Sequence, residues 1–429
     1  MTNIFDWLLP RYKLDKSKKT RLITLFSGYD SQKLAFNYID KNVEHYKAIE
    51  FDKYAIQTLN EIHNTQFETI DIKSIGGGYL DIVDKSHYQY IMTYSFPCTD
   101  LSLAGKRRGM QKDSGTRSSL LWEVERLLNE TKELPDVLIM ENVKQVLTAD
   151  GWEDWCLFLE QKGYSNYAEV LNAKNYGIPQ NRERCFMVSI LGEYNYTFPK
   201  RIKLKHKLKD LLDTQVDEKY FISEKMILGM KKTKFNSYGY DDNNMTNRKI
   251  TKTLTTSTGG RAPLFIEIPE ATKTGFKQAF EGDGVYINRP YQKRGTVQNN
   301  MSQTIKTQLD IGVVVRDSEN YIEWKTPGRL DIDCRAYKED KIASTTTTTP
   351  KQKVLLNDLR IRRFTPKECF RLMGVKDSDS NKITCSDTQK YKQAGNSIVT
   401  TCLMAIYSQL YDDVDYVYYI EKLLKQLKE

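Results

Sequence analysis

The feature that most constrains this chain is the alternation of apolar runs with amphipathic stretches between residues 21 and 198. Such alternation predicts an α/β fold with a doubly wound, mostly parallel sheet. The expected strands are residues 21–26, 46–50, 88–94, 137–140 and 184–190. The expected helices between them are residues 31–42, 52–64, 118–133 and 152–162.

The composition changes near Pro199, and the chain then becomes rich in Lys, Thr, Asn and Gly with short β-like runs. Helical periodicity returns at Leu359, and Thr365, Pro366 and Glu368 together predict a helix start with a capping box. We therefore expect a second, smaller, β-rich domain and a C-terminal segment that packs back on the first domain. The expected boundaries are 1–20 for an N-terminal extension, 21–198 for the first domain, 199–357 for the second and 358–429 for the C-terminal segment.

A weak repeat occurs in the second region. Threonine-rich runs at 253–256, 304–307 and 345–348 each stand a few residues before an apolar run. This pattern predicts repeated β-ribbon units in the second domain. Chance recurrence in a threonine-rich segment is the alternative.

Charge and cysteine usage narrow the class of protein. The net charge of +9 suits a nucleic-acid partner, although a basic soluble protein would show the same excess. The seven cysteines contain no C-x-x-C pair, so a disulfide framework or a metal site is not expected, and a reducing, cytoplasmic location is. No apolar run approaches the roughly 20 residues of a membrane helix, and the start does not resemble a signal peptide.

Two residues at strand ends suggest a nucleoside site. Gly28 follows the first expected strand, and Glu50 ends the second, where an acid can bind ribose hydroxyls. Asp71 is a third candidate, placed to meet an adenine amine. Each acid alone is more often solvated surface, but their order favours adenosine. Because G-x-G-x-x-G is missing, a nicotinamide dehydrogenase is a distant alternative.

Cys98 follows the third expected strand, at the edge where open α/β sheets place ligands, and Pro97 stiffens the loop before it. A lone cysteine is more often a small buried residue. Its position after a strand and the cations at 106–108 instead favour a nucleophilic thiol or phosphate binding.

Glu141 ends the next strand and is expected at the same sheet edge as Cys98. A thiol and a carboxyl group in one cleft suit nucleophilic catalysis with acid assistance. Arg182 and Arg184 open the last expected strand, and alternation predicts that they share one face, where they could hold a base carbonyl or a phosphate.

Ordered blocks of the chain resemble the cytosine-5 DNA methyltransferases of the bacterial and phage type. The matching blocks are residues 24–28 (TLFSG), 50–55 (EFDKYA), 96–98 (FPC) with Ser102 and Gly105, 141–143 (ENV), 180–184 (QNRER), 363–374 (RFTPKECFRLMG) and 395–397 (GNS). One departure is visible, because Tyr29, Asp30 and Ser31 stand where the family continues with glycines.

The resemblance implies S-adenosylmethionine as cofactor and a Rossmann-like catalytic domain. Phe26 would stack on the adenine, Glu50 would hold the ribose and Asp71 the adenine amine. The other expected cofactor residues are Gly28 in the turn, Phe51, Ile72, Pro97 and Leu120 along the pocket, and Asn396 and Ser397 near the methionine part.

The resemblance also implies the reaction. A cytosine would be flipped out of the duplex, and Cys98 would attack its carbon 6. Glu141 would hold cytosine N3, while Arg182 or Arg184 would hold the base carbonyl and position Cys98. Carbon 5 would then take the methyl group, and loss of its proton, with water as a plausible base, would release Cys98. No metal is required.

The region 199–357 would be the target-recognition domain, with Thr345 and Thr346 near the flipped base. Arg107 and Arg117 are also expected to contact DNA. The expected protein is a monomer acting on double-stranded DNA in the cytoplasm of a bacterial or phage-infected cell, with or without a partner restriction endonuclease. Two alternatives stay open at this point: a tRNA cytosine-5 methyltransferase, and a non-catalytic DNA-binding relative.

Overall fold

The computed structural model describes residues 9–97, 117–222, 265–287, 294–307, 310–316, 322–323, 335–336 and 359–429. The chain forms two compact units. The first contains Met1–Leu212, Thr304–Leu309 and Thr365–Glu429, and the second contains Asp213–Gln303 and Asp310–Phe364.

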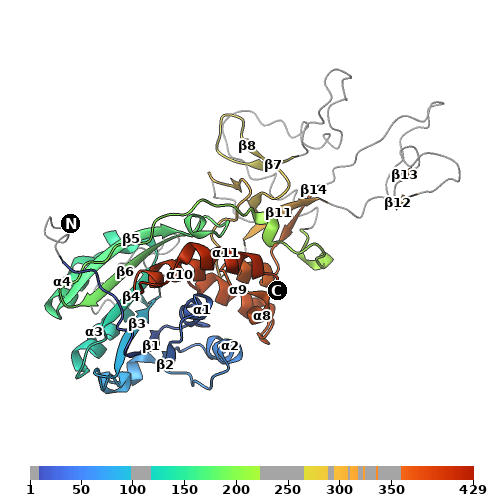
Figure 1. The fold of residues 1–429 in the computed structure, drawn as a ribbon. Helices are drawn as coiled ribbons and strands as arrows, with labels where there is room; N and C mark the ends of the chain where they lie inside the picture. Colours follow the sequence, from blue (N-terminus) through green and yellow to red (C-terminus); the bar gives the residue numbers. More distant parts are fainter. Residues whose placement is uncertain are drawn as a thin grey trace, which may run out of the picture. The chain divides into compact units, whose positions relative to one another are not determined.

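A six-stranded sheet forms the centre of the first unit (Figure 1). Its strand order is β2-β1-β3-β4-β6-β5, in which β2, β1, β3 and β4 run parallel and β6 and β5 are antiparallel to their neighbours. The strands are β1 (Lys19–Leu25), β2 (Glu44–Ile49), β3 (Tyr88–Tyr94), β4 (Val137–Asn142), β5 (Tyr164–Asn172) and β6 (Glu183–Leu191).

This sheet confirms the predicted α/β fold class, and all the expected strands occur. The strand β5 was not expected from the sequence. It is an edge strand whose residues, YSNYAEVLN, are largely polar and only partly buried, so it lacks the apolar run by which the others were recognised.

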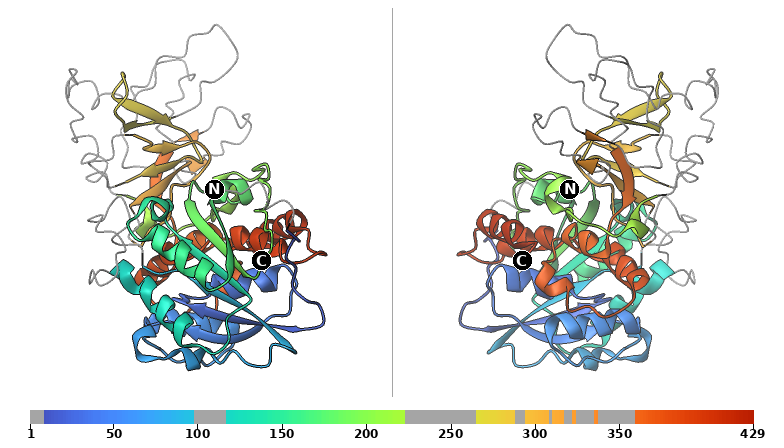
Figure 2. Two further views of the ribbon diagram at one scale, coloured as in Figure 1. Left: turned by 90° about the vertical axis from the view of Figure 1, so that its left-hand side faces the viewer. Right: turned by 90° about the vertical axis from the view of Figure 1, so that its right-hand side faces the viewer.

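Helices cover both faces of the sheet (Figures 1 and 2). On one face, α3 (Leu121–Glu130) and α4 (Trp152–Gln161) bury Leu127, Trp155 and other side chains in one apolar cluster with the strands. On the other face, α2 (Lys53–His63) packs on Ala48. Because strand side chains alternate between faces, a sheet covered on both faces needs apolar residues on both, and the central strands β3 and β4 are almost entirely buried. The expected helices 31–42 and 118–133 are shorter, since α1 spans Ser31–Tyr38 and α3 follows a 3₁₀ helix, η4 (Arg117–Leu120).

The C-terminal segment belongs to the first unit. Its helices are α7 (Pro366–Arg371), α8 (Asp377–Ser380), α9 (Asp387–Asn396), α10 (Thr400–Ser408) and α11 (Tyr416–Gln426). Helix α10 packs on α1, where the rings of Tyr407 and Phe36 stack 3.9 Å apart. The predicted capping box is confirmed: Glu368 N donates to Thr365 Oγ1 over 3.2 Å, and Thr365 N donates to Glu368 Oε2 over 2.8 Å.

A short segment, Thr304–Leu309, also belongs to the first unit although both its neighbours in the chain belong to the second. It passes so close to Gly395 that a Cβ at this glycine would lie 2.3 Å from backbone atoms of Lys306 and Thr307. The threonines at 304–307 therefore do not form a ribbon in the second domain, which corrects that part of the repeat hypothesis.

The second unit is built from short antiparallel strands around a small apolar core that includes Val285, Val314 and Ile361. Its sheets have the orders β10-β9-β11-β14, β7-β8 and β12-β13. The strands are β7 (Ile266–Pro269), β8 (Phe276–Ala279), β9 (Gly284–Tyr286), β10 (Val297–Gln298), β11 (Ile311–Arg316), β12 (Ile322–Glu323), β13 (Arg335–Ala336) and β14 (Leu359–Arg363). The threonine runs at 253–256 and 345–348 lie outside the described residues.

Residues before β1 form an extended strap along the first unit. Tyr12 N donates to Asn195 O, Leu14 N to Leu410 O, and Asp15 N to the side chain of Gln89. The strap thereby joins the chain after β6, the α10–α11 connection and β3. No helix in the described part of the chain is long and apolar enough to cross a membrane.

The capping box gives a stability prediction. Thr365→Ala removes the oxygen that accepts from Glu368 N and should lower the free energy of unfolding by about 1 kcal/mol. Thr365→Ser retains that oxygen and should stay close to wild type. Thermal denaturation of the three proteins measures the difference, and equal melting temperatures for wild type and Thr365→Ala would contradict the prediction.

Candidate active site

The carboxyl ends of the parallel strands bring several of the predicted site residues to one edge of the sheet. Phe26 follows β1, Glu50 follows β2, Ser95 follows β3 and Glu141 lies near the end of β4. The register places Leu25 opposite Tyr94, and Tyr94 opposite Met140, so the chain leaves these neighbouring strands at one level. Ligands of open α/β sheets bind at this kind of edge.

Glu141 lies at the centre of a polar cluster at this edge. Its Oε2 accepts a 2.6 Å hydrogen bond from Ser95 Oγ, and its Oε1 lies 3.1 Å from Arg184 Nε. The Glu141 side chain is 6% exposed and that of Arg184 is 19% exposed. A carboxylate this buried needs both partners, and they fix its orientation toward the edge.

Two side chains hold the loop that leads to Cys98. Asn142 Nδ2 donates to Phe96 O over 3.0 Å, and Ser118 Oγ donates to Pro97 O over 2.9 Å. The loop therefore leaves β3 beside Glu141 with two of its carbonyl groups fixed.

Some of the predicted site residues are not among the described residues. Cys98, Arg107, Thr345 and Thr346 lie outside the described residues, as does the side chain of Arg117, the first residue of η4.

Arg182 and Arg184 contact different groups. Arg184 contacts Glu141, whereas the buried guanidinium of Arg182 donates to three backbone carbonyls, those of Ile305, Gly395 and Ser397, over 2.7–3.1 Å. The spacing of the two arginines along the chain did not indicate this difference in partners.

Glu50 is held by backbone N–H groups. Its Oε2 accepts from Gly28 N over 2.9 Å and its Oε1 from Asp52 N over 2.8 Å. Burial raises the pKa of Glu50 above its ordinary value, although the N–H groups of Asp52 and Gly28 oppose this shift. The neighbouring Phe51 is 76% exposed, so an apolar side chain stands in solvent beside the half-buried Glu50.

The next cofactor candidates are Asp71, Ile72 and Leu120. Asp71 caps the short helix that contains Ile72, and Ile72 is buried. Arg126 of α3 fixes this loop by donating to the carbonyls of Ile72 and Ile75. Leu120 is partly buried against the same core.

The C-terminal candidates lie at the end of α9. Asn396 is exposed and Ser397 is buried. Ser397 Oγ accepts a 2.9 Å hydrogen bond from the hydroxyl group of Tyr29, in the turn after β1. The structure therefore connects residues 368 positions apart in the sequence.

Some residues of this edge were not predicted. Ser95 adjoins the block 96–98 and Asn142 lies inside the block 141–143, and their short polar side chains beside Phe96 and Glu141 were the available signal. Asp30, His45 and His63 form a buried cluster under the turn after β1. No pattern along the chain indicated this cluster, because the two histidines stand outside every recognised motif.

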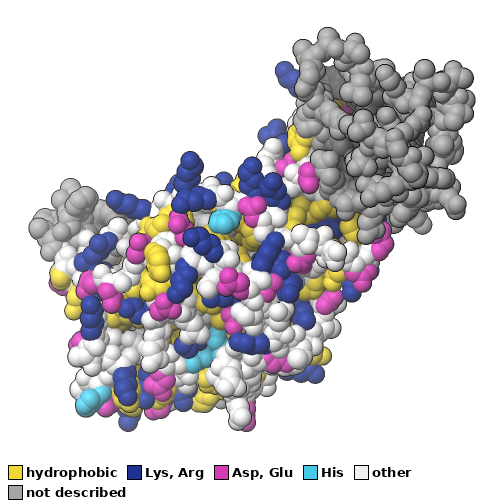
Figure 3. Space-filling model, turned by 45° about the vertical axis from the view of Figure 1, so that its right-hand side comes forward, with side chains coloured by type: hydrophobic (Ala, Val, Ile, Leu, Met, Phe, Trp, Pro, Cys, Tyr) yellow, Lys and Arg dark blue, Asp and Glu magenta, His cyan; other side chains and the backbone are white. Residues whose placement is uncertain are grey.

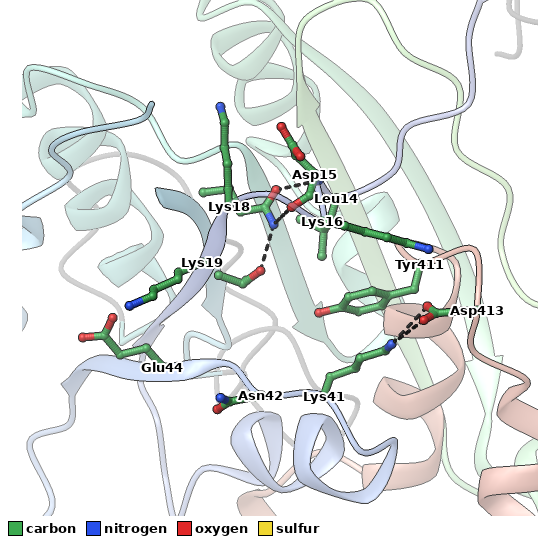
Figure 4. A pocket seen from close by; sticks show the side chains of 12 residues that line it. Leu14, Asp15, Lys16, Lys18, Lys19, Lys41, Asn42, Glu44, Tyr411 and Asp413 are labelled. Atoms are coloured by element: carbon green, nitrogen blue, oxygen red, sulfur yellow. Dashed lines mark hydrogen bonds and ion pairs between the residues drawn. The ribbon is translucent and has the colours of Figure 1, made fainter. Parts of the chain in front are cut away.

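A cavity of about 550 Å³ lies at the opposite edge of the sheet from these residues. It is lined by Lys19 and Glu44 among others, at the amino ends of the strands (Figure 4).

The charged side chains on the face in Figure 3 are mixed, because Lys and Arg alternate with Asp and Glu and do not form one basic patch. Among the described residues, no group of three or more His, Cys, Asp or Glu could hold a metal ion.

Comparison with known proteins gives a family match over most of the chain. Residues 20–412 match the family model described as C-5 cytosine-specific DNA methylase. The type II methyltransferase M2.ScrFI of Lactococcus lactis subsp. cremoris is 30% identical over 347 residues, which are 80% of this chain and 70% of that protein. The orphan methyltransferase M.SPRI of Bacillus phage SPR is 26% identical over 450 residues, covering 91% and 97% of the two chains.

The fold also matches solved structures. A methyltransferase of Entamoeba histolytica, EhMeth, aligns with a TM-score of 0.58 at 16% identity, over 92% of this chain and 99% of that one. At this identity the likeness concerns the fold alone.

The environment of Glu50 gives a pH prediction. A raised pKa means that the folded chain keeps this proton to a higher pH than the unfolded chain, so stability falls as pH rises from about 4.3 through the folded pKa. Glu50→Gln removes this titration. The melting temperature of wild type relative to Glu50→Gln should therefore decrease between about pH 4 and pH 7.

Glu130→Gln is the matched control of opposite sign. A backbone hydrogen bond from Gly77 and the side chain of Arg126 lower the pKa of Glu130, so its contribution to stability is present at neutral pH and is lost as pH falls. The melting temperature of wild type relative to Glu130→Gln should increase with pH. Slopes of the same sign for both variants would contradict the assignment for Glu50.

Proposed function

This chain belongs to the C-5 cytosine-specific DNA methylase family, and from that premise we propose a role for each site residue in the methylation of a cytosine. The protein is a DNA cytosine-5 methyltransferase. The observation that best supports these roles is the contact of Glu141 with Ser95 and Arg184, beside the loop that continues to Cys98.

The proposed cofactor is S-adenosylmethionine, which supplies the methyl group when bound. The residues at the sheet edge fit a nucleoside: the exposed Phe51 ring and Phe26 offer apolar faces to an adenine, and Glu50 offers a half-buried carboxylate to ribose hydroxyls. The remaining proposed contacts are Gly28, Asp71, Ile72, Pro97, Leu120, Asn396 and Ser397. A bound adenine would cover the exposed apolar ring of Phe51.

The proposed nucleophile is Cys98. Its sulfur would form a bond with carbon 6 of a cytosine flipped out of the duplex, and this addition makes carbon 5 nucleophilic. Glu141 would hold cytosine N3 and favour its protonation, so that the added electrons are accommodated in the ring. After methylation, loss of the carbon 5 proton and of the bond to Cys98 restores the aromatic base.

The two arginines take different roles in this proposal. Arg184 shares an ion pair with Glu141 and would hold the base carbonyl and help to position Cys98. Arg182 donates to the carbonyls of Gly395 and Ser397, so we propose that it positions the cofactor segment rather than the base.

Target recognition is proposed for the second unit, which forms short antiparallel strands in sheets separate from the six-stranded sheet. Thr345 and Thr346 remain candidates for contact with the flipped base, and Arg107 and Arg117 for contact with DNA. We further propose that the protein acts as a monomer in the cytoplasm. We do not extend the proposal to a partner endonuclease, because M.SPRI is named an orphan methyltransferase.

The decisive experiment is expression in a host without DNA methylation, followed by conversion sequencing of its genome. Wild type should protect cytosines within one short sequence, and Cys98→Ala should protect none. Purified Glu141→Gln and Arg184→Ala should lower kcat on duplex DNA by about 10²-fold or more, since each removes a group proposed to act on the base.

Glu183→Gln is the matched control, because Glu183 lies between the two arginines but forms an exposed ion pair with Lys144. It should keep nearly wild-type kcat. Protection of cytosines by Cys98→Ala would reject the nucleophile. A folded wild type that methylates tRNA and leaves DNA unmodified would reject the substrate.

A further inference from the structure

The turn between β1 and α1 has an unusual backbone. Phe26, Gly28 and Asp30 all adopt left-handed conformations, with φ values of 56°, 58° and 62°. This region suits glycine and is disfavoured for residues that have a Cβ atom. Asp30 must therefore be held in this conformation by its surroundings.

The carboxylate of Asp30 is fully buried and has partners on both oxygens. Oδ1 accepts from Lys33 N over 3.0 Å, which caps α1. Oδ2 accepts from Thr24 Oγ1 over 2.8 Å and lies 2.7 Å from Nε2 of His45, a residue of β2 that is also buried. Charge-assisted contacts of this length are among the strongest in proteins.

A second histidine holds the backbone of the same turn. His63, the last residue of α2, places Nε2 at 3.2 Å from Tyr29 O and 3.1 Å from Asp30 O. Burial lowers the pKa of His63 to about 4, so the ring is neutral near pH 7 and donates its Nε2 hydrogen to these carbonyls. The rings of His45 and His63 lie 5.3 Å apart, edge to face.

The outer side of the turn faces the proposed cofactor residues. Gly28 N donates to Glu50 Oε2, and the Tyr29 hydroxyl donates to Ser397 Oγ. Gly28 and Tyr29 therefore contact proposed cofactor residues. The next residue, Asp30, is anchored in the protein interior by Thr24 and His45.

We propose that Asp30, His45 and His63 are positioning residues that fix the first turn in its cofactor-binding shape. The inference rests on the proposed function of this edge as the S-adenosylmethionine site. The side chains contact the turn from its buried side, so their effect should fall on cofactor affinity and not on methyl transfer.

The test is calorimetric titration of the full-length protein with S-adenosylhomocysteine. Asp30→Gly keeps the left-handed backbone but removes every side-chain contact, and His45→Leu removes only the histidine contact. Both should bind about tenfold more weakly, as expected for loss of a charge-assisted hydrogen bond. His45→Gln retains an N–H donor and should bind nearly as tightly as wild type. For all variants kcat at saturating S-adenosylmethionine should stay within about twofold of wild type.

Two further variants keep the outcome interpretable. His87→Leu is the matched control, because His87 forms a similar 2.9 Å pair with Asp84 but is exposed and remote from the turn. It should leave binding unchanged. Asp30→Asn retains the cap and tolerates the left-handed backbone, so its weaker binding would report the lost charge even if Asp30→Gly fails to fold.

The outcomes that overturn the inference are distinct from those that overturn the proposed function. Wild-type affinity in Asp30→Gly would mean that this position needs only a left-handed backbone. A lowered melting temperature with unchanged affinity in His45→Leu would make the cluster merely structural. Both results would leave the cofactor site intact, whereas a wild type that fails to bind S-adenosylhomocysteine would reject the site itself.

Discussion

The parallel pairing of β1 with β3 and of β3 with β4 is the constraint on which the rest of the structure depends. The register of these strands is regular, so Phe26, Ser95 and Glu141 emerge at one level although they lie far apart in the sequence. A shift by one residue would turn each side chain to the opposite face. The contact between Ser95 and Glu141, and through it the approach to Cys98, requires this register.

The edge of the sheet contains two acids in different environments. Among the described residues, Glu50 accepts from the backbone N–H groups of the turns after β1 and β2, and burial raises its pKa. Glu141 faces a guanidinium group and a hydroxyl group. The backbone therefore provides one environment, and the side chains of Ser95 and Arg184 provide the other.

The sequence predicted the features that depend on local pattern. The strand ends at Gly28, Glu50 and Glu141 follow from apolar runs, and the capping box at Thr365 follows from residue spacing. It failed where tertiary contacts decide. Residue spacing could not give the partners of Arg182, which are backbone carbonyls far away in the sequence, and β5 is too polar to be recognised at the sheet edge. The cluster around Asp30 joins a turn, a strand and a helix end, and no local pattern identifies such a meeting.

The segment Thr304–Leu309 has a consequence for exchanging sequence specificity between relatives. The chain leaves the first unit after Leu212, returns for these few residues and leaves again until Thr365. Here Ile305 accepts from Arg182 and donates to Gln180, so the segment completes the catalytic unit. A chimera that replaces residues 213–364 as one block would therefore import a foreign piece of the catalytic unit. An exchange should instead replace two separate segments, 213–303 and 310–364, and keep this chain's own residues 304–309 between them.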